Sequence, residues 1–265
     1  MNEDIYAEIQ GYAEHLKLNP YTKGFPAFVD DEKMGPQELE AIRKVFKYLS
    51  RCKKETMIET LLKMSHMPVT ALKSFDDYNF DRISGRDIEQ LRNLPALSAI
   101  YANRNIAFIG PPGLGKTHLA MAYGQECCKR GLKTYFIKAS ELNQRLWNAK
   151  KYGHEGGIIN GLVRPSCLII DEMGRCKFDR ECTRMFFDIV DRRYSKEGPN
   201  CMIFTSNKSP NEWSQYFDEE DSLLAAMDRV FDNADIFVMN GESYRGQTRQ
   251  TYEVGLGMDS QLSVG

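Results

Sequence analysis

The sequence predicts an α/β fold, with helices covering both faces of a parallel sheet and a small all-helical unit ahead of it. Strand and helix patterns alternate from residue 105 onward, which is typical of βαβ units. The run "CLII" at 167–170 is apolar throughout, as expected of a strand buried on both faces. A glycine-rich turn joins a strand to a helix in "IAFIGPPGLGKTHL" at 106–119. With 265 residues, 42% of them hydrophobic, the chain can form one large domain with a small appendage.

Residues 1–66 are predicted to form the small helical domain, with a loop over 23–36. The apolar residues recur at helical spacing, and proline marks where one helix stops and the next begins. Helices are expected over 2–18, 37–51 and 53–66. This unit is either a packed three-helix appendage or a docking module for a partner or for DNA. An aromatic and acidic linker is expected over 67–85.

The α/β domain is predicted over 86–246, followed by a flexible tail over 247–265. Strands are expected over 105–110, 133–138, 167–171, 201–206 and 235–239. Helices are expected over 86–102, 116–130, 140–151 and 179–194.

Composition excludes several classes of protein. The formal net charge of −2 gives no global field that would attract nucleic acid, so such a partner needs a local basic patch. The cysteines number seven, an odd count, and two are adjacent, which argues against a disulfide framework. The acidic N-terminus is unlike a signal peptide, and no run reaches the ~20 apolar residues of a membrane span. We therefore expect a cytoplasmic protein with no membrane partner.

The strongest chemical motif is a phosphate-binding loop of the form G-x-x-x-x-G-K-[ST]. Backbone N–H groups of such a loop turn toward phosphates, and the following helix N-terminus adds positive potential. We expect Lys116 to reach the β- and γ-phosphates of ATP and Thr117 to offer its hydroxyl to Mg²⁺. The predicted nucleotide-binding residues here are Gly110, Pro111, Pro112, Gly113, Leu114, Gly115, Lys116, Thr117 and His118.

Two later strands end in polar side chains that fit the same site. In "CLIIDEMG", Asp171 ends an apolar strand where it can hold Mg²⁺ through water, and Glu172 can polarise an attacking water. In "MIFTSN", Asn207 can orient that water from the neighbouring strand end. The alternatives are that Glu172 is a solvated acid and that Asn207 merely starts a turn.

Two arginines near the end of the chain are candidates for phosphate contacts. Arg229 is either an arginine finger that reaches the γ-phosphate of a neighbouring subunit or part of a surface ion pair of little energetic value. Arg245, in "GESYRG", is the second candidate.

A basic helix with aromatic residues is the candidate DNA-binding element. Bases outnumber acids by eight to two over 129–164, and the helix "SELNQRLWNAKKYG" covers 140–153. Lysine and arginine can neutralise phosphates while aromatic rings pack on sugar or base. The alternative is a solvated helix that buries Leu142, Leu146 and Trp147. The predicted DNA contacts are Arg145, Trp147, Lys150, Lys151 and Tyr152.

The motifs "FIGPPGLGKTHLA", "LIIDEMG", "TSNKSPNEW", "LLAAMDRV" and "GESYR", in this order, resemble the IstB-like ATP-binding proteins. These are helper ATPases of insertion-sequence transposons and are similar to the DnaC and DnaI helicase loaders of the AAA+ initiator clade. The resemblance covers about 68–246 and includes the segment "MPVTALKSFDDYNF".

The resemblance implies roles for individual residues. Lys116 and Thr117 would be the Walker A pair, and Asp171 and Glu172 the Walker B pair. Asn207 would be the sensor residue, Arg229 the arginine finger and Arg245 a second sensor, although the tail after it lacks an obvious helical lid. The helical element at 140–164 would line the DNA path of the oligomer.

The function implied is a Mg-ATP-dependent AAA+ ATPase that forms a ring or spiral of its own copies on DNA. It would bind DNA largely without regard to sequence and deliver it to a transposase. The main alternative is a helicase loader whose N-terminal unit holds a replicative helicase. A P-loop kinase for small molecules is a further alternative, and it would have an acceptor pocket and show no response to DNA. An inactive scaffold would be expected to have lost the motif residues.

Overall fold

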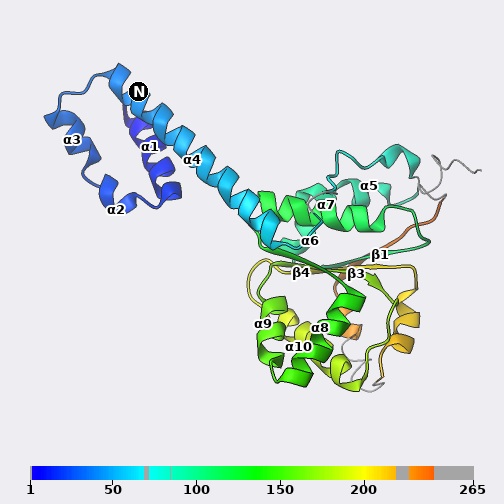
Figure 1. Ribbon diagram of the computed structural model, residues 1–265. Coiled ribbons are helices and arrows are strands. Elements are labelled where there is room, and N and C mark those ends of the chain that lie inside the picture. The colour runs from blue at the N-terminus through cyan, green and yellow to red at the C-terminus, as the bar shows by residue number, and fades with distance from the viewer. Residues whose placement is uncertain (1, 69–71, 84, 219–226, 242–265) are drawn as a thin grey trace, which may run out of the picture.

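The computed structural model describes residues 2–68, 72–83, 85–218 and 227–241. The chain forms an α/β body and an arm of helices that projects from it (Figure 1). Within the described residues, no helix combines the length and the apolar character needed to cross a membrane.

The body is built on a sheet of five parallel strands in the order β2-β3-β4-β1-β5. The strands are β1 (Asn105–Ile109), β2 (Thr134–Lys138), β3 (Cys167–Met173), β4 (Cys201–Ser206) and β5 (Ala234–Val238). Every residue of β1 and β4 is buried, which explains why their sequences are apolar without alternation. Because all strands run the same way, their carboxyl ends meet at one edge of the sheet.

Helices cover both faces of the sheet (Figure 1). One face carries α5 (Ile88–Arg92), η3 (Leu94–Ala96), α6 (Ser98–Tyr101) and α7 (Lys116–Lys129). The other carries α8 (Ala139–Tyr152), α9 (Glu155–Val163) and α10 (Arg180–Tyr194). Successive residues of a strand face opposite sides, so Phe108 belongs to the first hydrophobic core and Ile109 to the second. Short 3-10 helices complete the body at η2 (Phe80–Arg82) and η4 (Pro210–Tyr216).

The five strands and the helices α7, α8 and α10 lie within two residues of their predicted bounds. The single helix predicted over 86–102 is wrong, because three short helices occupy it. Pro95 interrupts the run and Leu97 takes a left-handed φ of 60°, so a continuous helix cannot form there. Helix α9 lies within the helical element that the resemblance implies at 140–164, although no separate helix was expected there from the residue pattern.

The arm contains α1 (Asn2–Leu16), α2 (Asn19–Thr22), α3 (Phe25–Asp31) and α4 (Pro36–Met64). The loop predicted over 23–36 is wrong because it contains α3, and the break predicted near residue 52 is absent. No glycine or proline lies between Pro36 and Met64, so nothing stops α4 from continuing. The predicted divisions at residues 66, 85 and 246 stay predictions.

Helix α4 connects the arm to the body. Its far end packs against α1, and its last turns enter the core on the α7 side of the sheet, where Leu61 is buried. The chain that follows is anchored as well, since the N–H of Phe136 in β2 donates to the carbonyl of Ser65 at 2.7 Å. The base of the arm is therefore fixed to the sheet.

Candidate functional site

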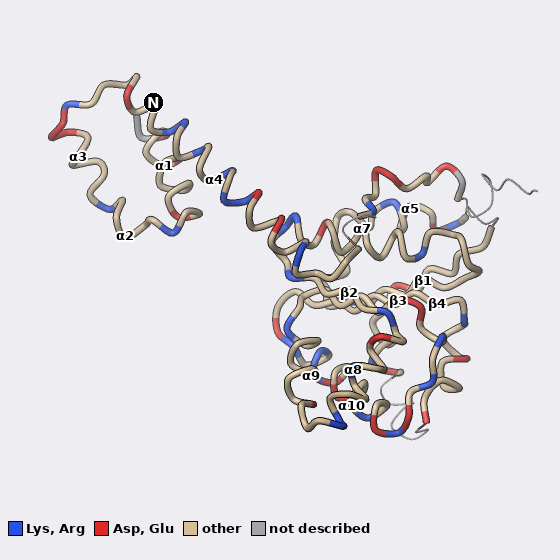
Figure 2. Tube along the Cα trace, viewed as in Figure 1, with Lys and Arg blue, Asp and Glu red and all other residues tan. Residues whose placement is uncertain are grey.

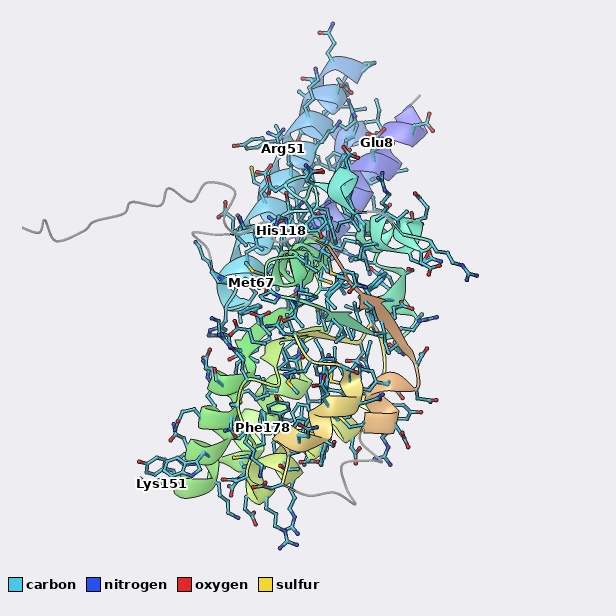
Figure 3. The ribbon with its side chains drawn as sticks, turned by 90° about the vertical axis from the view of Figure 1, so that its right-hand side faces the viewer. Glu8, Arg51, Met67, His118, Lys151 and Phe178 are labelled. Carbon is cyan, nitrogen blue, oxygen red and sulfur yellow. The ribbon has the colours of Figure 1, made fainter. Side chains whose placement is uncertain are left out.

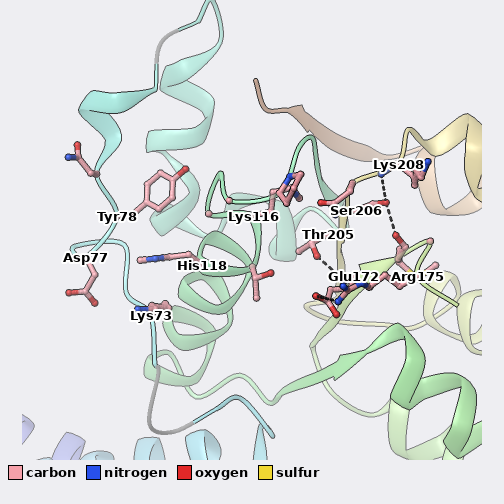
Figure 4. Close-up of a pocket in the computed structure, with 18 residues that line it drawn as sticks. Lys73, Asp77, Tyr78, Lys116, His118, Glu172, Arg175, Thr205, Ser206 and Lys208 are labelled. Carbon is pink, nitrogen blue, oxygen red and sulfur yellow. Dashed lines mark hydrogen bonds and ion pairs between the residues drawn. The ribbon is translucent and has the colours of Figure 1, made fainter. Parts of the chain in front are cut away.

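A cavity of about 830 Å³ opens at the carboxyl edge of the sheet (Figure 4). Four segments of the chain line it: 73–79, the phosphate-loop region at 112–118, residues 172–175 at the end of β3, and 205–208 at the end of β4. Eight residues predicted for the nucleotide site face it: Pro112, Gly113, Gly115, Lys116, Thr117, His118, Glu172 and Asn207. The topology explains this meeting, because parallel strands deliver their following loops to the same edge.

Two glycines of the phosphate loop have no substitute. A Cβ on Gly110 would lie 2.1 Å from the carbonyl oxygen of Met239, and one on Gly115 would lie 2.6 Å from the ring of Tyr78. Both residues also have positive φ, of 148° and 81°. Only glycine combines this backbone conformation with such close neighbours. The loop thereby brings the N-terminus of α7 to the cavity.

The Lys116 side chain is folded over the loop and is buried. Its Nζ donates to the carbonyls of Gly110 at 2.7 Å and Pro111 at 2.6 Å. Gly110, Pro111 and Leu114 shape the loop without lining the cavity, and the Leu114 carbonyl accepts a hydrogen bond from the Tyr78 hydroxyl at 3.0 Å. The ammonium group is thus held beside the cavity, where phosphate oxygens can replace the carbonyls as acceptors.

Asp171 and Thr117, the predicted magnesium residues, are in direct contact. The Asp171 carboxylate is 2% exposed, and its Oδ1 accepts the Thr117 hydroxyl at 2.7 Å. The same Oδ1 accepts the hydroxyl of Thr205 at 2.6 Å. A hydroxyl and a carboxylate are the oxygen ligands that suit Mg²⁺, so this donor set fits the ion.

Thr205 was missed by the sequence reasoning, although it connects both acids of the site. Besides donating to Asp171, its Oγ1 accepts the backbone N–H of Glu172 at 3.0 Å. Glu172 has a φ of 62°, a left-handed conformation that is uncommon for a non-glycine residue. The hydroxyl therefore fixes the Asp171 carboxylate and helps to hold the backbone that aims Glu172. The only signal in the sequence is a hydroxyl residue two positions before Asn207.

Replacing Thr205 by valine is expected to lower the turnover of ATP by about ten- to a hundredfold while ATP binding changes little. Valine has nearly the same shape, so the loss is that of hydrogen bonds to a buried charge, worth about 1.5–3 kcal/mol. Thr205→Ser keeps the hydroxyl and should restore most of the turnover. Steady-state hydrolysis and equilibrium nucleotide binding separate the two effects, and an unchanged turnover in the valine variant would contradict the positioning role.

The Glu172 carboxylate lines the cavity and is held by two cations. Oε1 accepts a hydrogen bond from Nη1 of Arg175 at 2.8 Å (Figure 4). Oε2 lies 3.9 Å from Nζ of Lys138. Asn207 lines the same cavity from the end of β4. The two residues predicted to handle the attacking water therefore border one space.

The segment 73–79, predicted to be only a linker, forms one wall of the cavity. The Tyr78 ring covers Gly115 and lies 5.2 Å from the His118 ring, edge to face. The His118 Nε2 is 2.7 Å from the carbonyl oxygen of Ser74, and burial lowers the pKa of this imidazole below its usual value. The contacts of Tyr78 with Gly115 and His118, and of His118 with Ser74, thus bind the segment to the phosphate-loop region.

Arg229 lies away from this cavity within the chain. Its Nη1 donates to the Asp191 carboxylate at 2.5 Å, and it borders a separate cavity of about 490 Å³. Asn105 and Met202, which also line that space, lie at the amino ends of β1 and β4. Arg229 therefore faces the opposite edge of the sheet from the phosphate loop. Arg245 and the tail at 247–265 lie outside the described residues.

The candidate DNA residues of α8 divide into two groups. Trp147 and Tyr152 are 46% and 63% exposed, and Nζ of Lys151 lies 5.2 and 5.3 Å from their rings (Figure 3). Leu142 and Leu146 are buried as expected, but the alternative that Trp147 is buried is wrong.

Arg145 and Lys150 are already paired within the chain. Arg145 donates to Glu141 at 2.7 Å and to the Tyr135 hydroxyl, while Lys150 donates to Glu181 at 3.1 Å. Lys151, an exposed cation between the rings of Trp147 and Tyr152, is therefore the candidate DNA-contacting cation of this helix that is most accessible.

Comparisons with known proteins agree with this architecture. The fold is similar to the crystal structure of DnaI, with a TM-score of 0.53 at 18% identity, covering 68% of this chain and 95% of that one. The predicted α/β fold, a parallel sheet flanked by helices with a phosphate loop after its first strand, is confirmed.

Two relatives are insertion-sequence proteins that are named as ATP-binding. The IS5376 protein of Geobacillus stearothermophilus is 39% identical over 201 residues, which cover 76% of this chain and 78% of the relative. The IS232 protein of Bacillus thuringiensis subsp. berliner is 30% identical, covering 92% of this chain and 96% of the relative. Residues 13–252 match the family described as IstB-like ATP binding protein. The chain therefore belongs to the IstB-like family of ATP-binding proteins.

Proposed function

We propose that this protein is a Mg-ATP-dependent ATPase that assembles on DNA and delivers target DNA to the transposase of an insertion sequence. The observation that carries the proposal is the meeting of Lys116, Thr117, Asp171 and Glu172 around one edge of the sheet. Family membership supplies the ATP-binding part. The relatives' insertion-sequence names support the transposition setting.

Each residue at the cavity has a defined task in this proposal. The Lys116 ammonium donates to the β- and γ-phosphate oxygens, and the Thr117 hydroxyl and Asp171 carboxylate hold Mg²⁺. The ion, when bound, neutralises charge on the phosphates. Glu172 takes a proton from the attacking water while Asn207 orients it, which favours hydrolysis over transfer to an acceptor.

The position of Arg229 supports the proposal that copies of this chain assemble with one another. Since it faces the opposite edge of the sheet from the phosphate loop, it cannot serve the nucleotide of its own chain. Copies stacked head to tail would place this arginine of one subunit against the cavity of the next, and repetition of that contact gives a ring or spiral. In this proposal the ion pair between Arg229 and Asp191 opens when the neighbouring subunit docks.

The first experiment is ATP hydrolysis with and without duplex DNA, with particle size measured in parallel. We expect hydrolysis to rise and large particles to form when ATP and DNA are both present. Lys116→Ala should abolish both effects because it removes the phosphate ligand. A monomer that ignores DNA would contradict the proposal and would favour a small-molecule kinase instead.

A helicase loader is the second candidate, and the projecting arm of α1 to α4 favours it, since such an arm can hold a partner away from the ATPase body (Figure 1). Capture by the full-length chain distinguishes the two. Retention of a purified replicative helicase, but not of a transposase, would favour the loader.

A further inference from the structure

We propose that one face of α4 is a second nucleic-acid-binding surface, separate from the Trp147 region of α8. We define the α4 stripe as Lys44, Lys47, Tyr48, Arg51 and Lys54. The inference rests on the DNA partner of the proposed function and identifies where on the arm the phosphate backbone of that DNA is bound.

Charge is segregated along the arm. Residues 1–40 carry nine Asp and Glu, whereas 41–54 carry six Lys and Arg and no acid. Figure 2 shows the resulting series of basic residues along α4. Because the chain as a whole is slightly acidic, this concentration of positive charge is a local feature.

The stripe occupies the side of α4 away from its packing partner. With 3.6 residues per turn, positions 44, 47, 48, 51 and 54 fall within about 120° of the helix surface. All five side chains are exposed. Leu39, whose side chain is buried, and the half-buried Phe46 lie on the side that packs against α1. Nothing in the described arm covers the stripe.

The cations of the stripe are poorly neutralised. Lys44 lies 3.9 Å from Glu40 and Arg51 lies 3.7 Å from Glu55, both as exposed pairs of little energetic value. In the described part of the chain, Lys47 and Lys54 have no carboxylate within 4.0 Å.

Arg43, which is on the α1 side of the same helix, shows the contrast. It pairs with Glu8 at 2.8 Å and with Glu40 at 2.7 Å, and these hydrogen bonds raise its pKa. The arginine that stabilises the arm is thus satisfied within the chain, and the stripe is left to bind an external anion.

An aromatic ring accompanies the charges. Tyr48 is 57% exposed, and Cζ of Arg51 lies 5.6 Å from the centre of its ring. The same combination of an exposed ring and a cation occurs at Trp147 and Lys151 on α8. Rings of this kind stack on bases or sugars while cations track the phosphates, a pairing that favours nucleic acid over an acidic protein.

The stripe is also long enough to contact several phosphates of one DNA strand. From Lys44 to Lys54 a helix rises about 15 Å, which matches roughly four phosphates along one DNA strand. Figure 1 shows that α4 projects from the α/β body as a rod, and the exposed stripe on it is therefore open to a duplex that lies along the helix.

The test compares two full-length triple variants that lose the same charge. Lys44, Lys47 and Lys54 are changed to Gln in one, and the exposed Lys17, Lys23 and Lys33 of the same arm in the control. Binding of a labelled duplex, with a non-hydrolysable ATP analogue present, is measured by anisotropy across a series of salt concentrations. The stripe variant should bind more weakly. Its plot of log K against log salt concentration should also be less steep, by about 1 for each lysine removed. The control should match the wild type, and Lys→Arg at the three stripe positions should retain the wild-type slope.

Three outcomes would overturn the inference. If the stripe variant and the control behave alike while the wild type binds DNA, the stripe does not touch DNA and the proposed function stands. If the wild type binds no DNA at any salt, the DNA part of the proposed function fails as well. If DNA binding is unchanged but the stripe variant loses an acidic protein partner, the surface serves a protein. Thermal melting of all variants checks that the arm remains folded.

Discussion

Glu172→Gln is expected to bind ATP and to form the same assemblies as the wild type while its turnover falls by about a hundredfold or more. Removing a positioned general base typically costs 10²–10⁴ in rate. The carboxylate borders the cavity and is bound by Arg175, and glutamine has nearly the same size, so glutamine fits its place. It also keeps the left-handed backbone, since glutamine has the same shape as glutamate. Steady-state hydrolysis with DNA, nucleotide binding and particle sizing measure the three properties.

The control for this prediction is Glu89→Gln, an equal change of charge on an exposed side chain of α5. It should leave hydrolysis unchanged. Normal turnover in Glu172→Gln would mean that the residue is a solvated acid held by Arg175 and Lys138, and that another group activates the water. Loss of assembly together with turnover would instead indicate that the acid serves a structural purpose.

The phosphate loop was predictable because its signals are local. Gly110 and Gly115 are required by backbone conformation, and Lys116 and Thr117 follow at fixed spacing on the first turn of α7. Asp171 was predictable from topology, because a strand-end acid in a parallel sheet must reach the same edge as the loop. Hydrogen bonding to Thr117 agrees with that reasoning.

Contacts between distant segments could not be predicted from the pattern. Tyr78 and Leu114 are 36 positions apart, and nothing in the composition of an aromatic linker says that it folds back on the phosphate loop. Thr205 was overlooked for the same reason, since its effect depends on the strand that lies beside it.

The arm shows a different cause of error. The apolar pattern changes phase near Cys52, which suggested two helices where the chain forms one. Arg51, Lys53 and Lys54 are good helix formers and no glycine or proline interrupts them, so helix propensity was the better guide here than periodicity.

Arg193→Met is expected to lower the free energy of unfolding by about 3 kcal/mol or more. Each buried carbonyl that loses its hydrogen-bond donor and stays unsatisfied costs about 1–3 kcal/mol. Arg193 lies in α10 and is fully buried. It donates to five carbonyls, those of Leu162, Val163, Pro165, Ser166 and Cys201. Burial lowers its pKa to about 10, so it remains charged at neutral pH. Denaturant unfolding measures the change.

The neighbouring Arg192 offers a matched control. It is exposed and pairs with Asp188 at 2.8 Å, so Arg192→Met should change stability by about 0.5 kcal/mol or less. Arg193→Lys keeps the positive charge, but an ammonium group has fewer N–H donors than a guanidinium group and lacks its planar fork. The stability of this variant should therefore fall between those of the wild type and the methionine variant.

This buried arginine has a consequence beyond stability. The carbonyls it binds belong to the end of α9, to the turn that leads into β3 and to the first residue of β4. It therefore ties the end of α9, the helix that follows α8, to the amino edge of the sheet, the edge that Arg229 also faces. If the methionine variant is as stable as the wild type, the cost of burying the charge cancels its hydrogen bonds. In that case packing of α8 and α9 against α10, and of α8 against β2 and β3, holds these helices in place, and the proposed DNA binding through α8 should survive the substitution.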